Sequence, residues 1–183
     1  MEQRAQSLKR VILGESMSAN TSPAWESDFN EIRAVIAQSY LADGLDGAAI
    51  DRLATLGTRR RYAAGEVIVK QDDAEEHLLI MAKGRAEIST YMDEPLYYLR
   101  PGMPFGEVAL IDEKPRSATV RAQEATEIVV LPAKELRALM YAHPEMGLIV
   151  LRNLARVLCS RVRASNQQIA ALLTVEELRE NRS

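Results

Sequence analysis

The stretch FGEVALIDEKPRSATV, residues 105–120, puts a glycine and a carboxylate before a short apolar segment and an arginine ten residues beyond that glycine. Gly106 lets the backbone approach a ligand closely, because no Cβ stands in the way. The segment GEVALI is predicted to form one short helical turn, whose free N–H groups favour an anion. Arg116, expected on the next strand, has a planar guanidinium that pairs with two phosphate oxygens at once.

The acidic residue in this motif needs a role other than phosphate binding. Glu107 would repel a phosphate if its side chain pointed at one. A carboxylate that accepts a hydrogen bond from a sugar hydroxyl, beside a bound phosphate, would avoid that conflict. Ala109 is small and leaves the approach open. Together these residues predict a pocket for a compact phosphate bonded to a ribose, which is the shape of a cyclic nucleotide.

Short apolar segments separated by turns surround the motif. Strands are predicted at residues 66–70, 77–82, 85–91, 95–99, 117–122 and 126–131. Glycine and proline separate them, and a short hairpin turn is expected around Met92-Asp93-Glu94. Many short strands at regular spacing favour a sandwich, jelly roll or barrel over a parallel sheet.

Helices are predicted on both sides of the strands. The first begins at Ser22-Pro23 and ends at Gly44, and a shorter one follows Asp46. The apolar face of the first comprises Trp25, Phe29, Ile32, Ile36 and Tyr40, and that of the second comprises Ile50, Leu53 and Leu56, before Gly57. After the strands, one helix starts at Pro132, and a long amphipathic helix runs from Pro144 to about residue 173. The predicted fold is therefore α+β and mainly β, a β-roll or jelly-roll barrel flanked by helices.

The motif resembles the phosphate-binding cassette of the cyclic nucleotide-binding domain family, which includes catabolite activator proteins, kinase regulatory subunits and nucleotide-gated channels. The family pattern is matched without a gap at Phe105-Gly106-Glu107, at Ala109-Leu110 and from Pro115 to Thr119. The resemblance covers about residues 46–173. One departure is Asp72, which stands where the family commonly has a glycine, and it affects only a turn.

The resemblance implies a role for each matched residue. Arg116 would clamp the cyclic phosphate with Ser117 and backbone N–H groups, and Glu107 with Gly106 would hold the ribose 2′-hydroxyl. Ile88 would touch the base, and a lid over the purine would come from the long helix, at Leu158, Arg161 and Val162. The candidate ligand-binding residues are Gly106, Glu107, Val108, Ala109, Arg116, Ser117, Ala118, Ile88 and Arg161. No catalytic residue and no metal ligand is expected.

The chain divides accordingly into five parts. They are a flexible N-terminus at 1–21, N-terminal helices at 22–57, the β-roll with its cassette at 58–131, C-terminal lid or dimerisation helices at 132–173, and a tail at 174–183.

Composition limits the remaining function classes. The formal net charge of −3 over 183 residues gives no sign of a nucleic-acid binder. A single cysteine, Cys159, excludes an internal disulfide framework and fits a reducing compartment. The longest apolar run near the N-terminus is Val11-Ile12-Leu13, too short for a signal peptide or a spanning helix. A cytoplasmic protein without membrane attachment is expected.

Other readings of individual residues are less favourable. His77 and His143 are the only histidines, whereas a cupin-type metal enzyme needs several converging on one ion. Cys159, amid apolar residues of the long helix, is expected to be buried or to pack in an interface. The basic triplet Arg59-Arg60-Arg61 is assigned no binding role, because most such runs are solvated faces or strand edges.

The long helix is expected to make a homodimer. Residues 144–173 span roughly 45 Å at about 1.5 Å per residue, more than a small barrel can cover. The apolar stripe along this helix comprises Leu151, Leu154, Leu158, Val162, Ser165, Ile169 and Leu172. The far half of the stripe would then pair with the same helix of a second copy.

Three functional hypotheses follow. The first is a non-enzymatic cyclic nucleotide sensor, with cAMP favoured over cGMP, that repositions its C-terminal helix and acts on an unknown effector protein. The second is a transcription regulator, but only ten residues follow Leu173, too few for a helix-turn-helix, so no direct DNA binding is expected. The third is a degenerate domain that serves only protein interaction. A ligand-induced rise in melting temperature separates the first from the third.

Overall fold

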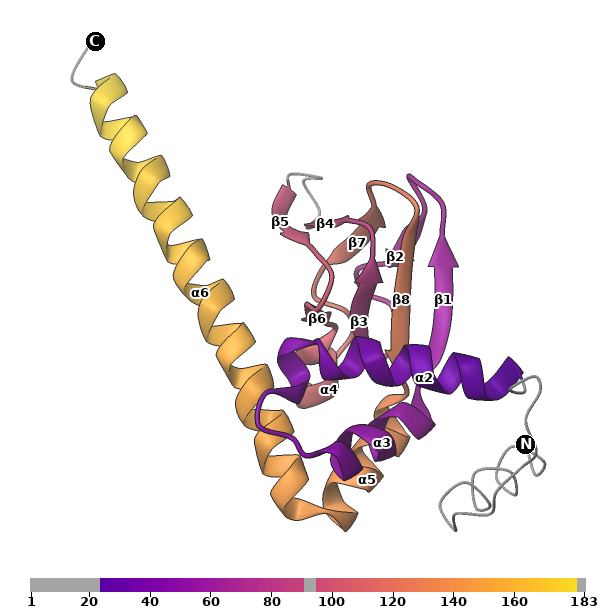
Figure 1. Ribbon diagram of the computed structural model, residues 1–183. Helices are drawn as coiled ribbons and strands as arrows, with labels where there is room; N and C mark the ends of the chain where they lie inside the picture. Colours follow the sequence, from indigo (N-terminus) through magenta and orange to yellow (C-terminus); the bar gives the residue numbers. More distant parts are fainter. Residues whose placement is uncertain (1–23, 91–94, 181–183) are drawn as a thin grey trace, which may run out of the picture.

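The computed structural model describes residues 24–90 and 95–180. Within them, eight strands form two antiparallel four-stranded sheets, in the orders β1-β8-β3-β6 and β2-β7-β4-β5. The strands are β1 (Thr58–Tyr62), β2 (Val67–Val69), β3 (Leu78–Lys83), β4 (Ala86–Ser89), β5 (Pro95–Leu99), β6 (Pro104–Phe105), β7 (Thr119–Ala122) and β8 (Thr126–Leu131). The expected α+β, mainly β, roll is confirmed (Figure 1).

Strand β8 contributes side chains to two hydrophobic cores, one inside the roll and one beneath the helices. All six of its residues are buried, and it pairs with β1 on one side and β3 on the other. Because side chains alternate along a strand, Ile128 and Val130 contribute to the core inside the roll. Val129 and Leu131 contribute instead to a second core, beneath the helices.

Five α-helices and one 3₁₀ turn accompany the strands in the described part of the chain. They are α2 (Ala24–Ala37), the 3₁₀ turn η1 (Tyr40–Ala42), α3 (Gly47–Leu56), α4 (Glu107–Asp112), α5 (Ala133–Ala142) and α6 (Pro144–Glu180). Asp46 caps α3 by accepting a hydrogen bond from the backbone N–H of Ala49 at 2.7 Å, as its sequence position indicates. In Figure 1, α2, α3 and α5 lie beneath the roll, and α6 projects away from it.

The start of helix α6 is packed into the hydrophobic core beneath the roll. Met146, Val150 and Leu154 are buried in the core shared with α2, α3 and α5. Asn153, 2% exposed, donates hydrogen bonds to the carbonyls of Leu41 at 2.9 Å and Asp43 at 2.8 Å. Further along, Val162 and Ile169 are more than half exposed. The stripe seen in the sequence therefore divides, since Leu154 enters the core while Val162 and Ile169 are exposed.

Several boundaries differ from the sequence prediction. The first helix ends at Ala37, because the chain turns there: the Tyr40 N–H bonds to the carbonyl of Gly102 at 3.1 Å, which leaves the Tyr40 side chain 59% exposed. Strands β1 and β6 were not predicted, and β1 consists of the residues TRRRY. Helix α6 continues past residue 173 to Glu180.

Some expectations concern residues outside the described part of the chain. These are the flexible segment 1–21, the helix start at Ser22-Pro23 and the hairpin turn at Met92-Asp93-Glu94. Among the helices that are described, none combines the length and the apolar character needed to cross a bilayer.

Candidate functional site

A glycine in a left-handed conformation opens the site. Gly106 caps α4 with φ +79°, which is a conformation that side-chain-bearing residues rarely adopt. A Cβ at this position would lie 2.7 Å from the carbonyl oxygen of His77 and would also meet the guanidinium of Arg116. The glycine is therefore required both by its backbone angle and by the approach of Arg116.

Arg116 is held at this turn by backbone carbonyls. It is 3% exposed, and its two terminal nitrogens donate to the carbonyl of Gly106 at 3.2 Å and to that of His77 at 2.9 Å. Its Nε, also buried, has no hydrogen-bond partner. Both partners are neutral acceptors, so the positive charge is not cancelled by a bonded carboxylate.

Glu107 is fully buried at the start of α4 and faces the long helix. Its Oε1 accepts a hydrogen bond from Nη1 of Arg161 at 2.6 Å, and Nη2 of Arg161 donates to the carbonyl of Pro104 at 2.9 Å. Its Oε2 is buried without a partner. An unpartnered buried carboxylate oxygen is costly, and a hydroxyl donor would satisfy it.

A small cavity of about 60 Å³ lies between these groups. All nine residues proposed from the sequence line it, together with Val69, Phe105 and Val120. The structure thus brings residues from β4, the α4 turn, the following loop and α6 to one place. Val69 and Val120 were not identified as site residues, because nothing in the sequence distinguishes an apolar strand residue that lines a site from one that packs in the core.

Backbone carbonyls and one tyrosine complete the site, and no sequence pattern pointed to them. The carbonyls of His77 and Pro104 fix the two arginines, but a carbonyl leaves no signature in the residue type. On β5, the Tyr97 hydroxyl donates to the backbone carbonyl of Arg161 and lies 2.9 Å from Oγ of Ser165. This tyrosine ties the middle of α6 to the roll.

The other two residues expected in the lid lie elsewhere. Leu158 and Val162 do not line this cavity, and they do not line the larger cleft beside it, between α6, β5 and η1. Val162 is 58% exposed. Arg161 is the one residue of the expected lid whose side chain reaches the site.

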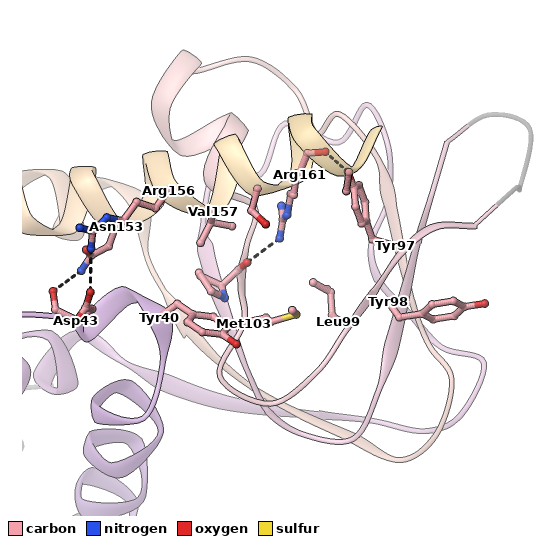
Figure 2. A pocket seen from close by; sticks show the side chains of 13 residues that line it. Tyr40, Asp43, Tyr97, Tyr98, Leu99, Met103, Asn153, Arg156, Val157 and Arg161 are labelled. Carbon is pink, nitrogen blue, oxygen red and sulfur yellow. Dashed lines mark hydrogen bonds and ion pairs between the residues drawn. The ribbon is translucent and has the colours of Figure 1, made fainter. Parts of the chain in front are cut away.

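A larger cleft of about 580 Å³ adjoins the small cavity, between α6, β5 and η1. Figure 2 shows the Arg161 side chain pointing from α6 into this cleft, with Tyr40 and Met103 on the opposite wall. Pairs between Asp43 and both Asn153 and Arg156 lie at one end of this cleft. Because Arg161 lines both spaces, its side chain stands at the boundary between them.

Carboxylates surround the buried arginine. Burial lowers the pKa of Arg116, and the carboxylates of Glu75, Glu107, Asp73 and Glu76 oppose that lowering. The guanidinium keeps its charge at any pH near neutrality, because arginine is not deprotonated in proteins. The site therefore offers a permanent cation to a ligand.

Residues considered for other chemistry take ordinary positions. Nδ1 of His77 accepts a hydrogen bond from the Ala133 N–H at 3.4 Å, and Cys159 is exposed rather than buried. In the part of the chain that the structure describes, no cluster of histidine, cysteine and acidic side chains is arranged to hold a metal ion.

Comparison with known proteins agrees with this geometry. Residues 59–143 match the family model described as the cyclic nucleotide-binding domain. The chain contains a cyclic nucleotide-binding domain. The resemblance carried by the cassette is thereby confirmed, and the domain's matched region includes every strand of the roll except the first residue of β1.

Relatives of several kinds carry similar domains. A Thermus thermophilus protein named cyclic AMP receptor protein is 34% identical over 145 residues, covering 77% of this chain and 65% of its own length. Glutaminase 2 of Bradyrhizobium diazoefficiens is 33% identical over 135 residues, covering 74% of this chain but 21% of that enzyme. A crystal structure of a cyclic nucleotide-binding domain from Methylobacillus flagellatus has a TM-score of 0.68 at 24% identity, covering 78% of this chain and 83% of that one. The chain thus spans less than two thirds of the length of the first two.

Proposed function

We propose that the protein is a non-enzymatic sensor that binds a cyclic nucleotide, cAMP in preference to cGMP. The observation that carries this proposal is the pair of unsatisfied buried atoms, Nε of Arg116 and Oε2 of Glu107. The first is a cationic donor that lacks an acceptor, and the second is an anionic acceptor that lacks a donor. A ribose cyclic phosphate presents an anionic oxygen and a hydroxyl side by side and suits both.

The preference for cAMP rests on the relatives. The Thermus relative is named as a receptor for cyclic AMP and matches over most of this chain. Ser117, which follows the arginine, is compatible with either nucleotide and does not separate them. The glutaminase name is not transferred, because the match spans about a fifth of that enzyme.

Binding is proposed to reposition α6. A cavity of about 60 Å³ holds only about two water molecules at about 30 Å³ each, far less than a nucleotide. Arg161 contributes the movable wall, because the part of α6 that carries it is attached to the roll mainly through Glu107, Pro104 and Tyr97. Displacing this wall opens the small cavity toward the cleft of about 580 Å³. Ligand binding would thus shift the population of α6 positions.

Calorimetric titration tests the binding proposal. Wild type is expected to bind cAMP more tightly than cGMP, and both more tightly than 5′-AMP. Arg116→Ala is expected to weaken cAMP binding by about 2–5 kcal/mol, because a buried charge contact is removed. Arg60→Ala, an exposed arginine on β1, is the matched control and should leave the affinity unchanged. Equal cAMP affinity in wild type and Arg116→Ala would remove Arg116 from the site and end the proposal.

We also propose a homodimer through α6. Val162, Ile169 and Leu173 are each more than half exposed, and at about 3.6 residues per turn they share one strip of the helix, beside the face that carries Arg161. Pairing with a second α6 would cover them as a coiled-coil stripe. Sedimentation velocity should give a dimer for wild type and a monomer for Ile169→Lys. Gln167→Lys, an exposed position on the opposite side of the helix, should remain dimeric, and a monomeric wild type would exclude this assembly.

A further inference from the structure

We propose that Asp73 and Glu75, in the segment between β2 and β3, make the site select a phosphodiester with one negative charge over a phosphate monoester with two. The inference rests on the proposed function, because it concerns the charge of the ligand that Arg116 receives. It assigns a selective role to two carboxylates outside the cavity lining.

The backbone places this acidic segment directly beside Arg116. The Arg116 N–H donates to the carbonyl of Asp73 at 2.9 Å, and the Asp72 N–H donates to the carbonyl of Arg116 at 3.0 Å. The Gln71 N–H donates to Oγ1 of Thr119 at 3.1 Å, which fixes the segment at its other side. The acidic segment and the arginine therefore form one short, paired stretch of chain.

The carboxylates of this stretch differ in whether they are neutralised. Glu76 is paired with Arg137, and Glu107 is paired with Arg161. Asp73 and Glu75 are exposed, and neither has an ion-pair partner among the described residues. Both act electrostatically on the Arg116 guanidinium. The Arg116 guanidinium therefore lies in the field of two carboxylates, Asp73 and Glu75, that no ion pair neutralises.

This balance distinguishes ligands by charge. A cyclic phosphate carries one negative charge, whereas a phosphate monoester carries about −1.5 to −2 at pH 7. Arg116 meets the first charge. The other cation lining the cavity, Arg161, is already bonded to Glu107, so a second negative charge meets the field of Asp73 and Glu75. That field opposes a dianion about twice as strongly as a monoanion, because the energy is proportional to the ligand charge.

The proportionality gives a quantitative expectation. If removing the two charges multiplies the affinity for a monoanion by some factor, it multiplies the affinity for a dianion by the square of that factor. A gain of about threefold for cAMP therefore corresponds to a gain of about tenfold for 5′-AMP. Both gains should shrink in about 1 M salt, where the screening length falls to about 3 Å.

The experiment compares three ligands by calorimetric titration: cAMP, 5′-AMP and adenosine 5′-methyl phosphate. The last shares the open shape of 5′-AMP but carries one negative charge, so it separates charge from shape. In Asp73→Asn/Glu75→Gln, we expect about threefold tighter binding of cAMP and of the methyl ester, and about tenfold tighter binding of 5′-AMP. Glu75→Gln alone, which leaves Asp73 unchanged, should give a smaller gain in the same order. Glu124→Gln, an exposed carboxylate beyond the opposite end of β7, should change none of the three.

Each outcome decides the inference. Equal gains for all three ligands, or no gain, would overturn it and leave the proposed function intact, provided that wild type binds cAMP. A gain shared by 5′-AMP and its methyl ester but not by cAMP would assign the selection to shape and would also overturn it. Failure of wild type to bind cAMP would overturn the proposed function itself, and this inference with it.

Discussion

Two arginines of this protein, one partly buried and one buried, are held in opposite ways. Arg59, on β1, contacts three carboxylates: its Nε donates to Oε1 of Glu127 at 2.6 Å, and its Nη1 pairs with Glu31 and lies 3.5 Å from Asp28. Arg116, beside α4, bonds only to the carbonyls of Gly106 and His77. The first charge is neutralised within the fold, while the second is positioned without being neutralised.

The difference separates a structural charge from one kept for a ligand. The charge of a cation surrounded by carboxylates is already neutralised, whereas a buried cation held by neutral carbonyls is still stabilised by binding an anion. The Arg59 side chain is 16% exposed and Arg116 is 3% exposed, so Arg116 is the more deeply buried of the two and yet has no bonded carboxylate. Each prediction below tests that distinction by changing one partner at a time.

The largest expected effects on stability and on cAMP affinity come from replacing each of the two arginines by alanine in turn. Arg59→Ala should lower the free energy of unfolding by about 3–4 kcal/mol, because Glu127, 10% exposed at its side chain, loses its main partner. Its cAMP affinity should match that of wild type, because Arg59 does not line the cavity. Arg116→Ala should lose cAMP binding and destabilise the fold less. Urea denaturation measures the stability of both variants, and calorimetric titration measures their cAMP affinity. Equal losses of stability would contradict the assignment of Arg59 to the fold and of Arg116 to the ligand.

A methyl group beside Arg116 should have the next largest effect. Gly106→Ala is expected to cost about 2–3 kcal/mol of stability, because φ is +79° and the new Cβ lies 2.7 Å from the His77 carbonyl and 2.9 Å from Leu79. Gly65→Ala is the matched control: φ is +85°, but no atom lies within 4 Å of its Cβ. It should cost only about 1 kcal/mol. Thermal melts of both variants are the measurement, and similar costs would show that crowding at Arg116 is unimportant.

Arg161 is an intermediate case, since it bonds both a carboxylate and a carbonyl. Removing it leaves fully buried Glu107 without a partner, so Arg161→Ala should cost about 1–2 kcal/mol. Glu107→Gln in the same chain should recover part of that loss. A double-mutant cycle in urea measures the coupling between the two side chains. A coupling of zero would mean that this ion pair does not hold α6 to the roll.

The smallest effect is a pH dependence at the structural arginine. Burial acts to raise the pKa of Glu127, but hydrogen bonds from Arg59 and Arg61 and the charges of Arg59 and Lys83 outweigh it and leave the pKa lowered. The carboxylate therefore contributes stability above its unfolded pKa of about 4.3, and that contribution is lost as pH falls through the folded pKa. Wild type should exceed Glu127→Gln in stability by about 1 kcal/mol more at about pH 6 than at about pH 3. Urea midpoints at both pH values decide it, and a constant difference would contradict the lowered pKa.

The cassette could be predicted from sequence because its residues are adjacent and constrained. Gly106 and Arg116 lie ten positions apart, and the short turn between them leaves few alternatives for their relative placement. Strands β5 and β8 were predicted at their observed bounds, since continuous apolar runs flanked by turn residues are a strong local signal.

Other features depended on partners that sequence spacing does not reveal. Strand β1, TRRRY, lacks an apolar pattern and exists because it pairs along β8 and places Arg59 among carboxylates from α2 and β8. The helix break after Ala37 reflects the bond from Tyr40 to the Gly102 carbonyl, more than sixty residues away. The placement of Val162 outside the site depends on how α6 is rotated against the roll, which an apolar stripe alone does not determine.

The hydrogen bonds from Asn153 to Leu41 in η1 and to Asp43 just after it give α6 a pivot at one residue, about which the helix can act as a lever. The helix extends about 30 Å from Asn153 to Leu173, at about 1.5 Å per residue. A tilt of about 10° at the fulcrum would carry the far end through about 5 Å, while the short arm would press on η1 and, through it, on α2. A displacement of about 2 Å at Arg161, which lies about 12 Å along the helix from the fulcrum, would thus grow to about 5 Å at Leu173.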